Sequence, residues 1–76
     1  MLVFSKEDTA GKLRGYRATA RLSQKQLSDI SGVGESSIKG YENEENVMSL
    51  ENAVKLANAL GITPNDLVSV VQKQEA

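Results

Sequence analysis

The 76-residue sequence predicts an all-α protein, a compact bundle of five short helices. Apolar residues recur at intervals of three and four along the chain, whereas the two-residue alternation of a strand never persists beyond a few residues. Residues that cap and stop helices divide the chain into five segments. Because a chain of this length has surface enough for one hydrophobic core, we expect a single domain over residues 1–76, with its core at about 5–72.

Serines mark the starts of the first two helices. Ser5 precedes two acidic residues, which suit the positive end of a helix that runs to about residue 20. Ser23 caps a second helix over 24–31, and Gly32 provides the permissive backbone that the following tight turn needs.

The third helix begins at Gly34 or Glu35, and Ile38 and Tyr41 share one of its faces. Residues 44–48 have no strong preference for helix or strand. We therefore expect them to form a loop.

Capping signals also delimit the last two helices. Ser49 opens a fourth helix that Gly61 stops. The run 63–66, Thr-Pro-Asn-Asp, combines an N-cap, a proline at the first helical position and an acid at the third. It predicts a fifth helix, which we expect to continue through Val70 and Val71 before a polar tail.

The predicted core takes apolar residues from every helix. Their helical spacing makes packing, rather than chemistry, the expected role of each. The set is Leu13, Leu27, Val33, Ile38, Leu50, Val54, Ala57, Leu60 and Leu67.

The composition argues against an enzyme. The chain has no cysteine and no histidine, which removes disulfides, thiolate metal sites and the commonest general base. It has no glycine-rich phosphate loop, and the carboxylates of Glu42, Glu44 and Glu45 are expected to form a solvated run. We therefore expect no catalytic residue, metal, cofactor or small-molecule substrate. No apolar stretch approaches the roughly 20 residues that span a bilayer, so we expect no membrane partner.

The net charge of −1 conceals an uneven distribution. Residues 1–39 hold seven basic residues against four acidic ones, and residues 40–76 hold two against six. A basic half can meet a polyanion while the acidic half faces away. Charge alone leaves a second interpretation open, an ordinary mixed surface in contact with solvent.

Residues 23–43 carry the most specific pattern in the chain. Two helices of about eight residues are separated by a glycine-containing turn, and Leu27, Val33 and Ile38 are spaced to bury their inner faces. Two steeply crossing helices of this kind form a helix-turn-helix unit. The start of its first helix offers free amides and a positive dipole end to a phosphate.

From about Leu13 to Leu67 the sequence resembles the lambda-repressor-like family, the phage Cro and repressor proteins and their XRE-type bacterial relatives. The motifs that carry the resemblance are Leu13 to Arg17, Leu22-Ser23-Gln24, Gly32-Val33, Ile38, Tyr41-Glu42-Asn43, Leu56 to Ile62 and Asp66-Leu67. The resemblance implies sequence-specific binding of double-stranded DNA by a transcriptional regulator, a repressor, whose third helix enters the major groove.

The resemblance also implies roles for individual residues. Positions that reach base edges fall on Glu35, Ser36 and Gly40, with Lys39 beside them and also able to donate to a phosphate. The residues that contact or position phosphates are Ser23, Gln24, Lys25, Ser37 and Asn43. Arg17 and Glu42 correspond to an ion pair that joins the first helix to the end of the third.

A homodimer on a two-fold operator is the assembly that the resemblance implies. The candidate dimer surfaces are Leu2, Val3 and Phe4 near one end of the chain and Val68, Val70 and Val71 near the other. The alternative is that both surfaces merely close the core. We expect a cytoplasmic, nucleoid-associated protein of bacterial or phage origin. The alternative function is a protein-interaction module that docks a partner through its acidic half.

Overall fold

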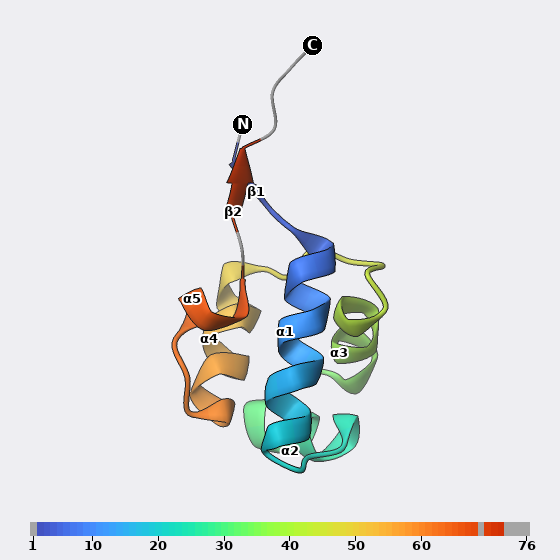
Figure 1. Ribbon diagram of the computed structural model, residues 1–76. Helices are drawn as coiled ribbons and strands as arrows, with labels where there is room; N and C mark the ends of the chain where they lie inside the picture. The colour runs from blue at the N-terminus through green and yellow to red at the C-terminus, as the bar shows by residue number, and fades with distance from the viewer. Residues whose placement is uncertain (1, 69, 73–76) are drawn as a thin grey trace.

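A computed structural model describes residues 2–68 and 70–72 of the chain. Five helices form its body: α1 (Lys6–Thr19), α2 (Gln24–Ser31), α3 (Glu35–Glu42), α4 (Leu50–Leu60) and α5 (Pro64–Leu67) (Figure 1). Two short strands, β1 (Leu2–Phe4) and β2 (Val70–Gln72), pair antiparallel and project from one end of that body. The predicted bundle of five helices is confirmed for the described residues, with the strand pair as an addition to it.

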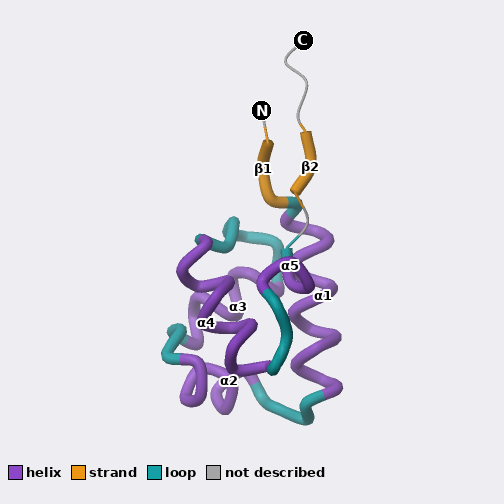
Figure 2. Tube along the Cα trace, turned by 90° about the vertical axis from the view of Figure 1, so that its left-hand side faces the viewer, coloured by secondary structure: helices purple, strands orange, loops and turns teal. Residues whose placement is uncertain are grey.

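Helix α1 lies between α3 and α5 and contacts both of them (Figure 1). Helix α2 packs against α3 and α4, and α4 packs against α5. Figure 2, turned by 90°, shows the strand pair standing clear of the helices and α2 at the opposite end of the body. None of the helices in the described ranges has the length and hydropathy needed to cross a membrane.

Helix boundaries coincide with capping side chains. The hydroxyl oxygens of Ser5, Ser23 and Ser49 each accept a hydrogen bond from the backbone N–H three residues later, which pairs an amide that the helix leaves free. Gly32 and Gly61 end α2 and α4 with φ of 79° and 70°, a conformation that strains most side chains. The predicted starts and ends of the first four helices therefore agree closely with the structure.

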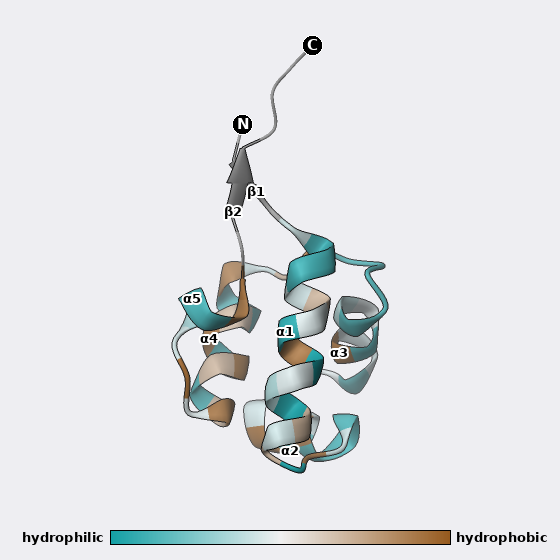
Figure 3. Ribbon diagram, in the orientation of Figure 1, coloured by the Kyte–Doolittle hydropathy of each residue, from teal (hydrophilic) through white to brown (hydrophobic). Residues whose placement is uncertain are grey.

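The core is one cluster that draws on all five helices. In Figure 3, segments of hydrophobic and hydrophilic residues alternate along the helices. Its largest fully buried side chains are Leu13, Leu27, Ile38, Leu56 and Leu67. Of the residues predicted from the sequence, Leu13, Leu27, Val33, Ile38, Ala57 and Leu67 are buried, and Leu60 packs against them partly buried.

The core prediction is wrong for Leu50 and Val54, which are 66% and 39% exposed. Both lie on α4, where Ala53, Leu56 and Ala57 face the core instead. A helix that packs on one side buries only part of its circumference. The apolar residues of α4 extend around the helix beyond this buried part. Two apolar side chains, one turn apart, are left on its outer side.

The fifth helix is shorter than the sequence predicts. It ends at Leu67, and Val68 after it is extended, with φ −114° and ψ 142°. Val70 and Val71 belong to β2, paired with Phe4 and Val3 of β1. β-branched residues favour the extended conformation, so the three valines within residues 68–71 stop the helix.

This change of structure alters the predicted dimer surfaces. Val68 is buried in the core cluster, so its side chain is not available to a partner. The side chains of the other expected members, Leu2, Val3, Phe4, Val70 and Val71, lie outside the part of the chain that the structure describes.

Truncation of a core leucine tests this packing. We expect Leu27→Ala to lower the free energy of unfolding by about 2–5 kcal/mol, because Leu27 has no exposed surface. Ile30→Ala removes an apolar side chain of the same size from a site on α2 that is 59% exposed and should change stability by less than about 0.5 kcal/mol. Urea denaturation measures both, and equal midpoints would contradict the core assignment.

Candidate nucleic-acid interface

The helix-turn-helix unit consists of α2, the turn 32–34 and α3. Leu27, Val33 and Ile38, one from each part, are buried in the same cluster. The N–H of Val33 donates to Ser31 Oγ at 3.1 Å, which fixes the turn from within. Because the inner side of α3 is buried in the core, only its outer side is open to contact with a partner.

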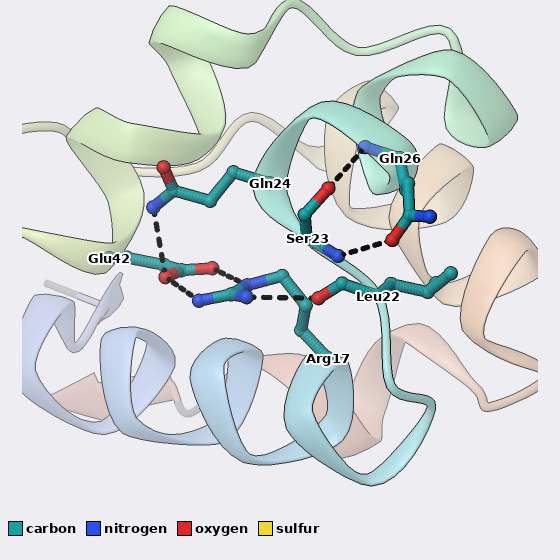
Figure 4. A network of polar contacts seen from close by, with 6 residues as sticks. All are labelled: Arg17, Leu22, Ser23, Gln24, Gln26 and Glu42. Atoms are coloured by element: carbon teal, nitrogen blue, oxygen red, sulfur yellow. Dashed lines mark hydrogen bonds and ion pairs between the residues drawn. The ribbon is translucent and has the colours of Figure 1, made fainter.

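A bidentate ion pair ties α1 to α3 (Figure 4). Arg17 Nε donates to Glu42 Oε2 at 2.7 Å, and Arg17 Nη2 donates to Glu42 Oε1 at 2.8 Å. Glu42 is only 3% exposed, and two parallel hydrogen bonds from a guanidinium offset the loss of its hydration. The hydrogen bond from Arg17 to Glu42 also raises the pKa of the guanidinium above its ordinary value. The pairing predicted from the sequence is therefore present, joining α1 to the end of α3.

Two further hydrogen bonds connect this pair to the start of α2 (Figure 4). Arg17 Nη1 donates to the carbonyl oxygen of Leu22 at 3.0 Å, and Gln24 Nε2 donates to Glu42 Oε1 at 3.2 Å. Three helices thus meet at one carboxylate: the end of α1, the start of α2 and the end of α3.

A second anchor joins α3 to α4. Asn52 Nδ2 donates to the hydroxyl oxygen of Tyr41 at 2.7 Å, and Tyr41 is 7% exposed. The backbone N–H of Asn52 is itself bound by Ser49, the cap of α4. The C-terminal half of α3 is therefore held on two sides, by α1 through the ion pair and by α4 through this amide.

The outer side of α3 carries the predicted base-reading residues. Glu35, Ser36 and Lys39 are exposed, and their side chains make no hydrogen bond or ion pair with other residues in the described ranges. Ser37 is half-buried, and Gly40 is buried. Three polar side chains of different chemistry, an acid, a hydroxyl and a base, are therefore presented together along the first turns of α3.

The residues at the start of α2 that are predicted to contact phosphates differ in the hydrogen bonds and ion pairs they already make within the protein. The hydroxyl of Ser23 accepts the N–H of Gln26 at 3.0 Å while Gln26 Oε1 accepts the N–H of Ser23 at 2.8 Å, a capping box (Figure 4). Gln24 donates to the ion pair described above. Lys25 lies 3.9 Å from Asp29, and both side chains are largely exposed. Such an exposed pair is weak, so the ammonium group is available to a phosphate.

Two residues beside these were not singled out from the sequence. Arg21 is exposed between α1 and α2, with a φ of 58°, two residues before the cap Ser23. The sequence does contain a signal for Arg21: it is a basic residue just before the start of a helix that is expected to contact a phosphate. Asn46, in the loop after α3, is exposed and lies against Gly40. Asn43, predicted from the sequence, is exposed at the end of α3.

The interface is acidic overall. Residues 23–46 contain two basic residues, Lys25 and Lys39, and five acidic ones. Of the five, Glu42 is neutralised by Arg17, and the other four are exposed. The surface around α3 therefore differs from a uniformly basic one and offers few cations to a phosphate backbone.

The arrangement of α2, turn and α3 defines the class of helix-turn-helix proteins. The sequence model of the family described as Helix-turn-helix matches residues 13–67, and the chain belongs to that family. The resemblance to lambda-repressor-like, XRE-type proteins predicted from the sequence is confirmed.

Two curated proteins are similar in sequence. The cryptic phage CTXphi transcriptional repressor RstR of Vibrio cholerae is 36% identical over 56 residues, which cover 74% of this chain and 50% of the repressor. The chain therefore spans about half the length of that relative. The control protein C.SmaI of Serratia marcescens is 36% identical over 64 residues, 84% of this chain and 76% of that protein.

Two solved structures share the fold. The restriction-modification controller protein C.AhdI from Aeromonas hydrophila has a TM-score of 0.75 and 38% identity, over 79% of this chain and 91% of that one. The hypothetical transcription factor NHTF from Neisseria has a TM-score of 0.79 and 25% identity, over 84% and 74% of the two chains. The family match and the names of these relatives, a transcriptional repressor and two controller proteins, support the predicted function class, DNA-binding transcription regulation.

Removal of the central carboxylate tests the role of the ion pair. We expect Glu42→Ala to lower the free energy of unfolding by about 3–5 kcal/mol, because it strands the partly buried guanidinium of Arg17. Glu45→Ala, at an exposed acid three residues later, should cost less than about 0.5 kcal/mol. Chemical denaturation compares the two variants. Indistinguishable midpoints would show that Glu42 is an ordinary surface charge.

Proposed function

We propose that the chain represses transcription by binding a specific sequence of double-stranded DNA, with α3 in the major groove. The observation that carries this proposal is the exposed outer side of α3, where Glu35, Ser36 and Lys39 have no partner among the described residues while the opposite side of the helix is buried. The major groove admits an α-helix and displays a distinct pattern of donors and acceptors for each base pair. Side chains at the start of α3 can therefore reach base edges without any rearrangement of the core.

Base preference and affinity fall to different residues in this proposal. Ser36 can donate or accept a hydrogen bond, whereas Glu35 only accepts, which suits the N4 amino group of cytosine. Lys39 offers a charged donor that can reach a phosphate. The further phosphate-contacting or positioning residues are Ser23, Gln24, Lys25, Ser37 and Asn43, with Ser23 acting through the first turn of α2 that it caps.

Docking of a protein partner is the second candidate function. Glu44 and Glu45 are both exposed directly after α3, and together with Glu35 they repel the phosphates that a DNA-binding surface must approach. The dependence of binding on salt separates the two candidates. Binding through phosphates weakens steeply as salt rises, because released counterions drive it, and a docking module need have no affinity for DNA.

Substitutions on α3 test the division of roles. Lys39→Ala should weaken binding to all duplexes alike and flatten the slope of log affinity against log salt by about one unit. Ser36→Ala and Glu35→Gln should instead change the preferred base at one position, by about 1–3 kcal/mol. The assay is fluorescence anisotropy on single-base variants of a duplex that the wild-type chain selects from a random pool.

Lys6→Ala is the matched control, because Lys6 is an exposed lysine in the first turn of α1 and belongs to neither α3 nor the outer side of α4. It should leave both the salt slope and the base preference unchanged. A changed base preference for Lys39→Ala, with an unchanged one for the Glu35 and Ser36 variants, would mean that the roles are reversed. A wild-type chain without salt-dependent affinity for any duplex would favour the docking function.

We also propose that two copies bind a two-fold operator, since one recognition helix covers only a few base pairs and half-sites lie about 34 Å apart. The surface that favours pairing is the outer side of α4, where Leu50 and Val54 are exposed beside the charged pair of Glu51 and Lys55. If two α4 helices pack antiparallel about a two-fold axis, Glu51 of one copy faces Lys55 of the other, and the reverse. The surface is therefore complementary to a second copy of itself.

Sedimentation at rising concentration, with and without a palindromic duplex, tests the dimer. We expect Leu50→Asp to raise its dissociation constant by at least about tenfold, because the variant places a charge in the apolar contact. Lys55→Glu should weaken the dimer and the double variant Glu51→Lys/Lys55→Glu should restore it. A wild-type chain that stays monomeric on the palindromic duplex would contradict the proposal.

A further inference from the structure

The position of Gly40 on α3 suggests that its backbone is exposed to solvent, but Gly40 is buried. It lies one turn after Ser36, away from the buried Ile38 and Tyr41, yet it is itself buried. The cause is Asn46: a Cβ built on Gly40 would clash with Asn46 Nδ2 and lie 3.3 Å from Asn46 Cγ. The carboxamide of Asn46 therefore occupies the space into which a side chain at position 40 would project.

The loop that follows α3 holds Asn46 in this place. Glu44 adopts the left-handed conformation, with a φ of 62°, and turns the chain back over the end of the helix. The N–H groups of Glu45 and Asn46 both donate to the carbonyl oxygen of Gly40, at 2.8 and 3.3 Å. The backbone of Asn46 is thus anchored to the residue that its side chain covers.

The carboxamide of Asn46 nevertheless has no hydrogen-bond partner among the described residues. Asn46 is exposed, and its side-chain amide makes no hydrogen bond within the described ranges of the chain. It therefore presents one donor group and one acceptor on the same side of α3 as Ser36. Neither Glu35 nor Lys39 can do the same, because a carboxylate only accepts and an ammonium only donates.

We propose that Asn46 is a base-reading residue, supplied by the loop in place of a side chain at position 40. This rests on the proposed function, with α3 in the major groove. A carboxamide pairs with adenine through two hydrogen bonds, to N6 and N7, so the structure assigns Asn46 to an adenine in the half-site. Gly40 then contributes by its lack of a side chain, which leaves room for the carboxamide.

Base-preference profiles test the assignment. A wild-type operator is first selected from a random duplex pool, and all single-base variants of it are titrated with each protein. We expect Asn46→Ala and Asn46→Asp to lose about tenfold or more in discrimination at one adenine-containing base pair and to keep the wild-type profile elsewhere. Gly40→Ala displaces the carboxamide and should alter the profile at that same base pair.

Asn65→Ala is the control, because Asn65 is an exposed asparagine on α5, away from α3 and the outer side of α4, and it should keep the entire profile. Thermal unfolding of each variant shows whether the fold is intact. If folded Asn46→Ala retains the wild-type profile, or loses affinity equally for every duplex, Asn46 does not read a base and the inference is wrong. If the wild-type chain itself prefers no sequence, the proposed function fails and the inference fails with it.

Discussion

One buried carboxylate, that of Glu42, sets the relative positions of three helices. A carboxylate removed from water is unfavourable unless its oxygens are paired, and here Arg17 and Gln24 supply the pairing from α1 and α2. The pairing is possible only when those elements converge on the end of α3. Correct placement of α3 is thus coupled to the stability of the whole helical body.

The same coupling explains how a helix of eight residues can be both core and contact surface. Ile38 and Tyr41 anchor its inner side, and the hydrogen bond from Asn52 to Tyr41 adds a fixed point on α4. Its outer side is then held by a rigid support, so the side chains on that side would lose little backbone freedom on binding a partner.

The sequence predicts this fold well where the signal is local. Caps such as Ser23, stop residues such as Gly32 and apolar spacing inside α2 and α3 act within one helical turn, and the helices follow them. The prediction fails where the outcome depends on other parts of the chain. Leu50 and Val54 have the right spacing for a core, but which side of α4 faces inward is decided by the neighbouring helices.

The interface shows the same division. The resemblance to a family implies which positions of α3 can reach base edges, so Glu35, Ser36 and Lys39 could be named in advance. The cover that Asn46 places over Gly40 could not, because it arises from a left-handed turn at Glu44, a residue with no special preference for that conformation. Arg17 and Glu42 are 25 residues apart, and only the resemblance to a family made their pairing predictable.

The strand pair has a consequence for how the protein folds. Its register joins Leu2 to Gln72, almost the largest sequence separation that the chain allows, whereas the contacts within and between successive helices are far more local. Closing so long a loop costs more chain entropy than a ladder of three residue pairs returns, unless the folded helices have already brought the two ends of the chain close together. We therefore expect the strands to assemble last and to open first, and we expect amide hydrogens there to exchange with solvent without unfolding of the helical body.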